Sequence, residues 1–349
     1  MKILSIVGAR PQFVKLAPIH HEIAKTESEH VVLHTGQHYD AGMSDSIFQD
    51  LRIPTPQINL GAGSGRHGEQ TGKMLAAIED ALDEVRPDKV LVYGDTNSTL
   101  AGALAATKMH FFVAHLEAGL RSRNRLMPEE INRVATDHIS DLCLAPTSNA
   151  LRILDSEGLG GRSELVGDVM ADVCLQTRSN VEDNPPKFSF DLPSEFVLAT
   201  IHRAENTDEP GRLADILSQL SASPLPVVLP AHPRLVTTAK KLNLSLNAGN
   251  LFPVKPVSYS ELVALVLRAT SVVTDSGGLQ KEAYLLNTVC TTVRPETEWP
   301  ETMTSGMNLL VEPGDILNAM QRSVGASSDP DLFGGGHAAS AVVHLLLES

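Results

Sequence analysis

The chain has 349 residues, 42% of them hydrophobic, a net charge of −14 and an isoelectric point of about 5.3. This length suits two domains of ordinary size, each with a core of its own. The negative charge and the lack of any run of Lys and Arg argue against nucleic acid as a partner, because nucleic-acid binding depends on cations that neutralise phosphates.

Short β-branched runs alternate with helix-like segments through the first half of the sequence. The runs are residues 2–7, 30–36, 89–95, 111–118 and 141–146, and the helix-like segments include residues 11–26, 98–109, 128–140 and 148–158. This alternation is typical of a parallel sheet with helices on both faces. It predicts that the first domain is α/β.

The same alternation restarts in the second half, after a polar stretch that contains three prolines (residues 179–195). The new runs are residues 196–202, 226–232, 250–254, 271–278 and 288–293. A second α/β domain is therefore predicted, with the boundary near residues 168–190. We expect domains at 1–168 and 169–335, and a final amphipathic helix, about 336–349, that packs back on the first.

Polar side chains gather where the predicted strands end, at residues such as Gly94, Asp95, His115 and Glu117 in the first domain. In parallel sheets, ligands bind beyond the carboxyl ends of the strands. We therefore expect the strand ends of both domains to line one interdomain cleft that holds the ligand.

Two cations flank a predicted helix start in the segment GARPQFVK. Arg10 stands directly before Pro11, a favoured first helical residue, and Lys15 follows one turn later. This pattern suits a phosphate group. Taken singly, each residue could equally be a solvated Arg or a Lys whose stem covers apolar surface.

The segment VVTDSGGLQKEAYLL reads as strand, tight turn and helix. It offers Ser276, Gly277 and Gly278 as hydroxyl and amide donors at a second helix start, where anions are attracted. Glu282, one turn later, is a suitable acceptor for the hydroxyls of a ribose. These features predict a nucleotide diphosphate between the domains. No GxxxxGK[ST] and no GxGxxG after the first strand occurs, which disfavours ATP hydrolysis and NAD chemistry.

Three carboxylates, Asp95, Glu117 and Glu129, follow neighbouring strand ends of the first predicted sheet. Clustered carboxylates shift one another's pKa and can divide acid and base roles. Structural roles are the alternatives: Glu129 could pair with Arg133, Glu130 could complement a helix dipole, and Asp95 could cap the following helix.

His202 ends the first strand of the second domain and could bind a phosphate oxygen or pass a proton. His232 is interpreted as structural, because the sequence names no partner for it.

No stretch approaches the roughly 18 apolar residues of a membrane span, and the first apolar stretch is too short for a secretory signal. We expect a soluble, cytoplasmic protein without a membrane partner.

Three cysteines, Cys143, Cys174 and Cys290, lie far apart, so neither a disulfide framework nor a structural zinc site is predicted. They are expected to be small buried side chains.

Eight segments occur in order along nearly the entire chain: GARPQFVKLAP, TGQHYD, VYGDTNSTLAGALAA, HLEAGLRS, MPEEINR, GDVMAD, HRAEN and TDSGGLQKEA. This ordered set resembles the non-hydrolysing UDP-N-acetylglucosamine 2-epimerases. The resemblance implies two Rossmann-like domains with parallel sheets, arranged as in glycosyltransferases of the GT-B type and facing across a cleft. The second domain would bind UDP.

The resemblance also implies the reaction, in which UDP-N-acetylglucosamine and UDP-N-acetylmannosamine are interconverted by UDP elimination and re-addition through a 2-acetamidoglucal. It implies no cofactor and no metal, a role in polysaccharide biosynthesis, and a homodimer, the commonest assembly of soluble enzymes.

Site residues follow from the same resemblance. Arg10 and Ser276 to Gly278 would lie near the diphosphate, Glu282 would take the ribose, and uracil would rest on the segment from Val257 to Leu262. The resemblance would assign catalytic importance to four residues already singled out, which are Asp95, Glu117, Glu129 and His202. Lys15 would lie near the end of the substrate that reacts.

The chain departs from the family pattern in the segment RPETEWPE, where Trp299 stands in place of a common arginine. An indole cannot make the charge-assisted hydrogen bonds of a guanidinium. The related enzymes that epimerise UDP-2,3-diacetamido-2,3-dideoxyglucuronate resemble this pattern, so that sugar is an alternative substrate, and Arg294 could supply a replacement charge. Some members of the family are activated by a second substrate molecule, and this chain differs from their pattern in the segment TGQHYDAGMS and at Ala204. These differences predict that this chain is not activated in that way.

Other classes remain open on the sequence alone. A hydrolysing 2-epimerase would release free UDP and N-acetylmannosamine. A GT-B glycosyltransferase would need an acceptor and usually lacks the clustered acids. A nucleotide-sugar sensor would bind without turnover.

Overall fold

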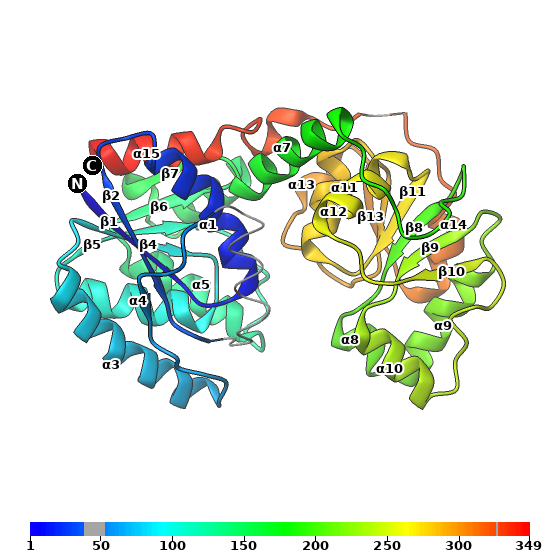
Figure 1. The fold of residues 1–349 in the computed structure, drawn as a ribbon, viewed down its shortest axis with the longest axis horizontal. Coiled ribbons are helices and arrows are strands. Elements are labelled where there is room, and N and C mark those ends of the chain that lie inside the picture. The colour runs from blue at the N-terminus through cyan, green and yellow to red at the C-terminus, as the bar shows by residue number, and fades with distance from the viewer. Residues whose placement is uncertain (38–52, 326) are drawn as a thin grey trace. The chain divides into compact units, whose positions relative to one another are not determined.

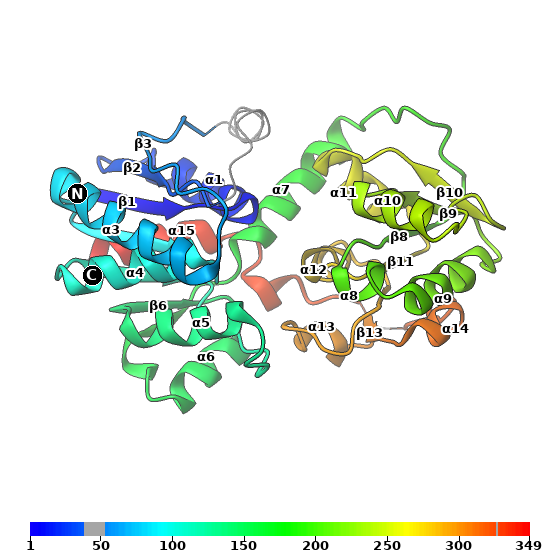
Figure 2. The same cartoon turned by 90° about the horizontal axis from the view of Figure 1, so that it is seen from below.

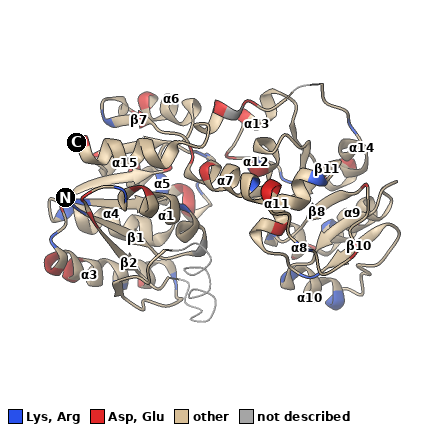
Figure 3. Cartoon of the chain, turned by 45° about the horizontal axis from the view of Figure 1, so that its top comes forward, with Lys and Arg blue, Asp and Glu red and all other residues tan. Residues whose placement is uncertain are grey.

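The computed structural model describes residues 1–37, 53–325 and 327–349, and its chain divides into two compact units. The first comprises Met1–Val173 with Asp331–Ser349, and the second comprises Cys174–Pro330. Figure 1 labels their elements, and Figure 3 shows acidic and basic residues interspersed along both units. No helix among the described residues is long and apolar enough to cross a bilayer.

The first unit holds a seven-stranded sheet of order β3-β2-β1-β4-β5-β6-β7, in which every pairing is parallel. Its strands are β1 (Lys2–Val7), β2 (Glu29–His34), β3 (Ile58–Asn59), β4 (Lys89–Tyr93), β5 (Phe112–Leu116), β6 (Leu142–Ala145) and β7 (Ser163–Leu165). Its helices are α1 (Arg10–Ile23), α3 (His67–Val85), α4 (Asn97–Lys108), α5 (Pro128–Ile139), α6 (Ser148–Ser156) and α15 (Ala338–Glu348). Helix α7 (Val169–Asp183) crosses from the first unit into the second.

The second unit holds a six-stranded parallel sheet of order β10-β9-β8-β11-β12-β13, whose elements can be followed in Figure 2. Its strands are β8 (Val197–Thr200), β9 (Val227–Pro230), β10 (Leu251–Val254), β11 (Ser271–Thr274), β12 (Cys290–Thr292) and β13 (Asn308–Leu310). Its helices are α8 (Ala204–Thr207), α9 (Pro210–Ser221), α10 (Pro233–Lys241), α11 (Tyr259–Arg268), α12 (Gly277–Leu285), α13 (Glu301–Thr304) and α14 (Ile316–Met320). The predicted α/β class with parallel sheets is confirmed.

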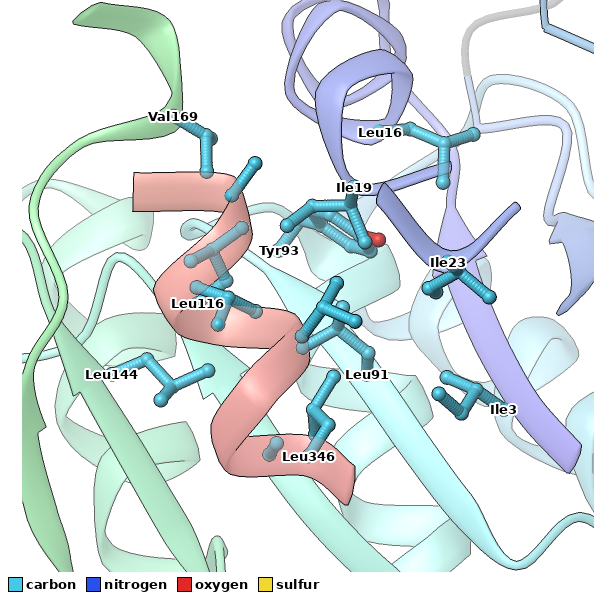
Figure 4. Packing of buried hydrophobic residues seen from close by; sticks show 14 of the residues in the cluster. Ile3, Leu16, Ile19, Ile23, Leu91, Tyr93, Leu116, Leu144, Val169 and Leu346 are labelled. Atoms are coloured by element: carbon cyan, nitrogen blue, oxygen red, sulfur yellow. The ribbon is translucent and has the colours of Figure 1, made fainter. Parts of the chain in front are cut away.

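Apolar side chains cover both faces of the first sheet, as the alternation predicts for buried strands. On one face, α1 and α15 pack over β1, β4 and β5, where Leu346 lies among Leu91, Leu116 and Leu144 (Figure 4). Helices α3 and α4 cover the other face, where Met74 and Ile78 are buried. The last helix is therefore part of the core of the first unit. The three cysteines are buried, as expected.

Strand order reverses direction at β1 and β4 in the first sheet and at β8 and β11 in the second. Between two such strands the following helices lie on opposite faces, which leaves the strand ends open to a ligand. The loops after β1 and β4 carry Gly8 to Arg10 and Gly94 to Thr96, and those after β8 and β11 carry His202 and Ser276. The topology thus places most of the predicted site residues at two switch points.

Gly8 generates a stability prediction, because an added Cβ there would lie 2.1 Å from Ser98 Oγ and 2.2 Å from Thr35 Oγ1. These hydroxyls bond each other at 2.8 Å in the core. We expect Gly8→Ala to lower the free energy of unfolding by about 1–3 kcal/mol, the usual range for overpacking. Urea unfolding followed by far-ultraviolet circular dichroism measures the change.

Gly72→Ala is the matched control, since Gly72 is exposed inside α3 and an added Cβ would meet nothing within 4 Å. It should raise the free energy of unfolding by about 0.5–1 kcal/mol, because alanine favours helix more than glycine does. Equal effects of the two substitutions would contradict the packing described for Gly8.

Candidate functional site

Helix α1 is fixed against the first sheet by the buried side chain of Gln12. Its amide oxygen accepts from the backbone amides of Gly8 at 2.8 Å and Ala9 at 3.0 Å. Its amide nitrogen donates to the carbonyl of Tyr93 at 2.8 Å and to Thr99 Oγ1 at 3.0 Å. The turns after β1 and β4 are therefore joined, and Lys15, one turn along α1, is brought beside the end of β4. Arg10 begins α1, but its side chain lies outside the described part of the structure.

Lys15 forms an ion pair with Glu117, which directly follows β5. Burial lowers the pKa of the Lys15 ammonium, but Glu117, and beyond it Asp95 and Asp168, raise that pKa by more. The net shift is upward, so the ammonium stays charged around neutral pH. The structure thus brings together three of the predicted site residues, one cation and two carboxylates.

Glu117 has a left-handed backbone, with φ of 72°, and Gly119 two residues later has φ of 81°. Non-glycine residues with positive φ are uncommon, and such strain is concentrated at functional sites. The amides of Glu117 and Ala118 both donate to the carbonyl of Leu144 at 3.1 Å, which holds the turn on β6. This turn directs the Glu117 side chain toward Lys15.

Asp95 is held by α5 rather than serving as the cap of α4. Its carboxylate accepts from Arg133 Nη2 at 2.6 Å, and its carbonyl accepts from Asn132 Nδ2 at 2.9 Å. Thr96 is the N-cap of α4 and accepts from the amide of Thr99. The capping alternative for Asp95 is therefore wrong, and its carboxylate faces a guanidinium.

Glu129 is exposed at the start of α5, whereas the next residue, Glu130, is buried. Glu130 accepts from the amides of Ser122 and Arg123, both at 2.8 Å, and pairs with Arg133 at 3.2 Å. Glu130 thus organises the loop before α5. Within the described part of the first unit, Glu117 pairs with Lys15 and the charge of Asp95 acts on Lys15, whereas Glu129 forms no ion pair or hydrogen bond with any of the three.

In the second unit, Ser276 is the N-cap of α12 and accepts from the amide of Leu279 at 3.3 Å. The amides of Gly277 and Gly278 belong to the first turn, where backbone donors have no partner within the helix. An added Cβ at Gly277 would lie 3.5 Å from Arg294 Nη1 and 3.8 Å from Arg203 Nη2. Backbone amides, a hydroxyl, the Arg203 guanidinium and the Arg294–Glu298 ion pair therefore lie around one helix start, where an anion such as a diphosphate is attracted.

His202 follows β8 and is tied to the buried carboxylate of Asp275. Its amide donates to both carboxylate oxygens at 3.1 and 3.0 Å, and its ring Nδ1 lies 3.3 Å from one of them. Burial lowers the pKa of His202, with His232, Arg203 and Arg234 adding to that effect, while Asp275 opposes it. The net shift is downward, so the ring is neutral at pH 7 and can donate to a phosphate oxygen.

The segment from Val257 to Leu262 begins helix α11 through a capping box of Ser258 and Glu261. Tyr259 in this segment donates its hydroxyl to Glu282 Oε1 at 3.0 Å. Burial and the neighbouring Glu282 raise the pKa of Tyr259, so it keeps its proton. The expected uracil and ribose positions are thus adjacent in the second unit.

Trp299 is only 5% exposed, and the ammonium of Lys281 lies 4.0 Å from its ring centroid. A cation packs well on an indole face, so this pair stabilises the loop before α13. Arg294 forms a two-point ion pair with Glu298, at 2.9 and 3.0 Å, and is 3% exposed. The charge of Arg294 is therefore balanced by Glu298 of the same loop.

Several residues of these sites were not singled out as site residues by sequence reasoning. Arg133 is the partner of Asp95, and the ring of His232 lies 5.7 Å from that of His202, although the sequence suggested only structural roles for both. Tyr259 had a signal, since it lies in the segment expected to hold uracil.

The TGQHYDAGMS pattern falls largely outside the described residues, so the activation hypothesis stays a prediction. Among the described residues, no three His, Cys, Asp or Glu side chains are grouped to hold a metal.

Comparison with known proteins identifies the family. Residues 21–347 match the family described as UDP-N-acetylglucosamine 2-epimerase. A homologue of that enzyme from Methanococcus maripaludis is 46% identical over 99% of both chains. UDP-2,3-diacetamido-2,3-dideoxy-D-glucuronate 2-epimerase from Pseudomonas aeruginosa is 44% identical, also over 99% of both.

Solved structures give the same result. The UDP-GlcNAc 2-epimerase of Methanocaldococcus jannaschii, crystallised with UDP-GlcNAc and UDP, superposes with a TM-score of 0.89 at 39% identity, with all of both chains covered. The calicheamicin glycosyltransferase CalG4 shares the fold alone, with a TM-score of 0.52 at 13% identity over 99% of this chain and 93% of that one. The chain therefore belongs to the UDP-N-acetylglucosamine 2-epimerase family and is an isomerase, a UDP-sugar 2-epimerase of the non-hydrolysing kind.

Proposed function

We propose that the chain interconverts UDP-N-acetylglucosamine and UDP-N-acetylmannosamine. The observation that carries this proposal is the pairing of Lys15 with Glu117 beside Asp95, at the switch point of the first sheet. A cation next to two carboxylates suits a reaction that moves a proton while negative charge leaves on a diphosphate. The family match and the solved relative bound to UDP-GlcNAc support the same substrate.

The chemistry of C2 explains why UDP has to leave. No carbonyl acidifies the C2 proton, so direct removal is too slow near neutral pH. In the proposed reaction the C1–O bond breaks, its electron pair goes to the diphosphate oxygen, and a carboxylate takes the C2 proton. The resulting 2-acetamidoglucal then receives a proton on its other face while UDP re-adds at C1.

The residues of the two units would divide this work. Asp95 and Glu117 would remove and return the proton, with Lys15 paired to Glu117. Ser276 to Gly278 and neutral His202 would donate hydrogen bonds to the leaving diphosphate, and Glu282 would accept from the ribose. Arg10 and Glu129 are retained as proposed site residues on the resemblance alone. We also propose a homodimer.

A second substrate, UDP-2,3-diacetamido-2,3-dideoxyglucuronate, is favoured by two specific observations. The Pseudomonas aeruginosa relative named for that sugar is 44% identical, against 40% for the Methanocaldococcus jannaschii UDP-N-acetylglucosamine 2-epimerase. Trp299 also occupies the position where an arginine is common in enzymes for UDP-N-acetylglucosamine. The two sugars therefore have to be compared directly.

Incubation in deuterated water, followed by NMR, tests the reaction. We expect deuterium at C2 of UDP-N-acetylglucosamine, appearance of the manno epimer and an intact nucleotide sugar, because the C2 proton exchanges with solvent on the enzyme. Release of free sugar would indicate hydrolysis instead. If only the diacetamido uronate exchanges, the second substrate replaces the first.

Glu117→Gln should lower kcat by about 10²- to 10⁴-fold, since it removes a group proposed for proton transfer. The KM for the nucleotide sugar should change little, because Glu117 is not among the residues proposed to bind the diphosphate. Steady-state rates measure both values. Glu164→Gln, at an exposed position on β7, is the control and should keep wild-type kcat. An unchanged kcat in Glu117→Gln would exclude the proposed role.

Tyr259→Phe should weaken UDP binding by about 3- to 10-fold, the effect of losing one hydrogen bond to a carboxylate acceptor. The hydroxyl orients Glu282, and without it the acceptor for the ribose is less well placed. Isothermal titration calorimetry with UDP gives the affinity. Tyr284→Phe removes a hydroxyl that instead accepts from the amide of Asp329, so it should leave UDP affinity unchanged. Equal affinities for wild type and Tyr259→Phe would contradict the nucleoside site.

A further inference from the structure

His115 is fully buried on β5, and each of its ring nitrogens faces an acceptor. Nδ1 lies 2.6 Å from a carboxylate oxygen of Asp137, and Nε2 lies 2.7 Å from the carbonyl oxygen of Gly94. A carbonyl oxygen cannot donate, and an ionised carboxylate cannot either. Both hydrogen bonds form only if both ring nitrogens carry a proton.

The surrounding charges are consistent with a cationic ring. Arg121 Nη1 pairs with the second oxygen of Asp137 at 2.7 Å, and Arg121 Nη2 pairs with Glu157 at 2.7 Å. Burial raises the pKa of Asp137, but His115 and Arg121 lower it by more, so the carboxylate is ionised. Burial raises the pKa of the adjacent Cys143 thiol to about 12, which keeps that thiol neutral. Arg121 extends this pairing outward to Glu157, whose side chain is 29% exposed.

We refer to these four side chains as the His115 cluster; they are His115, Asp137, Arg121 and Glu157. The cluster binds the backbone close to both proposed acids, before Asp95 and after Glu117. The Gly94 carbonyl that His115 binds belongs to the residue before Asp95. The second oxygen of Asp137 also accepts from the amide of Gly119 at 3.1 Å, two residues after Glu117. One buried ion pair therefore ties the loop of one acid to the turn of the other.

We propose that His115 donates a hydrogen bond from both ring nitrogens and that Asp137, acting through it and through Gly119, is the positioning residue that holds the Glu117 turn and the Asp95 loop in register for epimerisation. The catalytic part of this inference rests on the proposed function, and the protonation of His115 does not. Glu117 needs such support because its left-handed backbone is strained. A small displacement of a reacting group can cost about 10²-fold in rate.

The protonation state is tested on the wild-type protein by ¹⁵N NMR with labelled histidine. We expect His115 to show two N–H signals, protected from exchange by burial, because each ring nitrogen faces an acceptor. His115→Gln identifies them by their loss, and the exposed His138→Gln should leave them in place. A single ring proton on His115 in the wild type would overturn the assignment, whether or not any variant folds.

The positioning role is tested with Asp137→Asn. An asparagine that keeps its oxygen toward Gly119 and Arg121 turns its NH₂ toward Nδ1, so His115 should lose one proton and become neutral. We expect kcat to fall by about 10²-fold, with unchanged KM and unchanged affinity for UDP. His115→Gln, which removes the charge but leaves Asp137, should lower kcat in the same way and is the second variant if Asp137→Asn does not fold.

The outcomes separate the two proposals. Wild-type kcat in a folded Asp137→Asn variant would overturn the positioning role, and so would a rise in KM at constant kcat. Failure of the proposed function would appear in the wild-type protein as no deuterium exchange in either sugar, while the NMR result on His115 would still decide its protonation.

Discussion

The arrangement of the first unit depends on one buried amide, the side chain of Gln12. It uses both lone pairs of its oxygen on the turn after β1 and both of its N–H groups on the end of β4 and on α4. An amide has two donors and can accept twice, so this side chain is fully satisfied. Its contacts fix where α1 begins relative to β4, and Lys15 reaches Glu117 only because that start is fixed. Loss of the amide would remove the acceptor of the buried backbone amides of Gly8 and Ala9, which is costly.

Helix α5 has a comparable role on the other side of the same strand ends. Glu130, Arg133 and Asp137 lie on its buried face and bind the loop at Ser122, the carboxylate of Asp95 and the turn after Glu117. Charges of opposite sign alternate along this face, and each is compensated by a neighbour. The cost of removing the charges from water is thus offset by partners, as buried ionic groups require. The helix is therefore a scaffold for the acids, while Glu129 at its start faces solvent.

Much of this organisation can be read from the sequence, and the rest cannot for identifiable reasons. The alternation of apolar runs and helices gave the two parallel sheets, because strands buried on both faces are continuously apolar. Ser276 and its glycines predicted a helix start because that signal is local. Asp95 was different, because a role as the cap of the following helix and an ion pair with Arg133 are equally compatible with the sequence. Only the fold decides between them.

The environment of Trp299 was also beyond sequence reasoning, since nothing local indicates that Lys281, 18 positions earlier, packs on its ring. The same limit applies to His115, which the sequence placed at a strand end but whose two acceptors come from the loop after β4 and from α5. Long-range polar contacts of this kind depend on register between elements, whereas turns and helix starts depend on neighbours along the chain.

The Lys281–Trp299 contact has a practical consequence. Trp299 is the single tryptophan of the chain, and Lys281 lies on the helix whose first turn carries Ser276 to Gly278. Intrinsic ultraviolet emission therefore originates mainly from one indole in the second unit, with a charged quencher against its face. Steady-state fluorimetry can follow events at that helix without any attached dye.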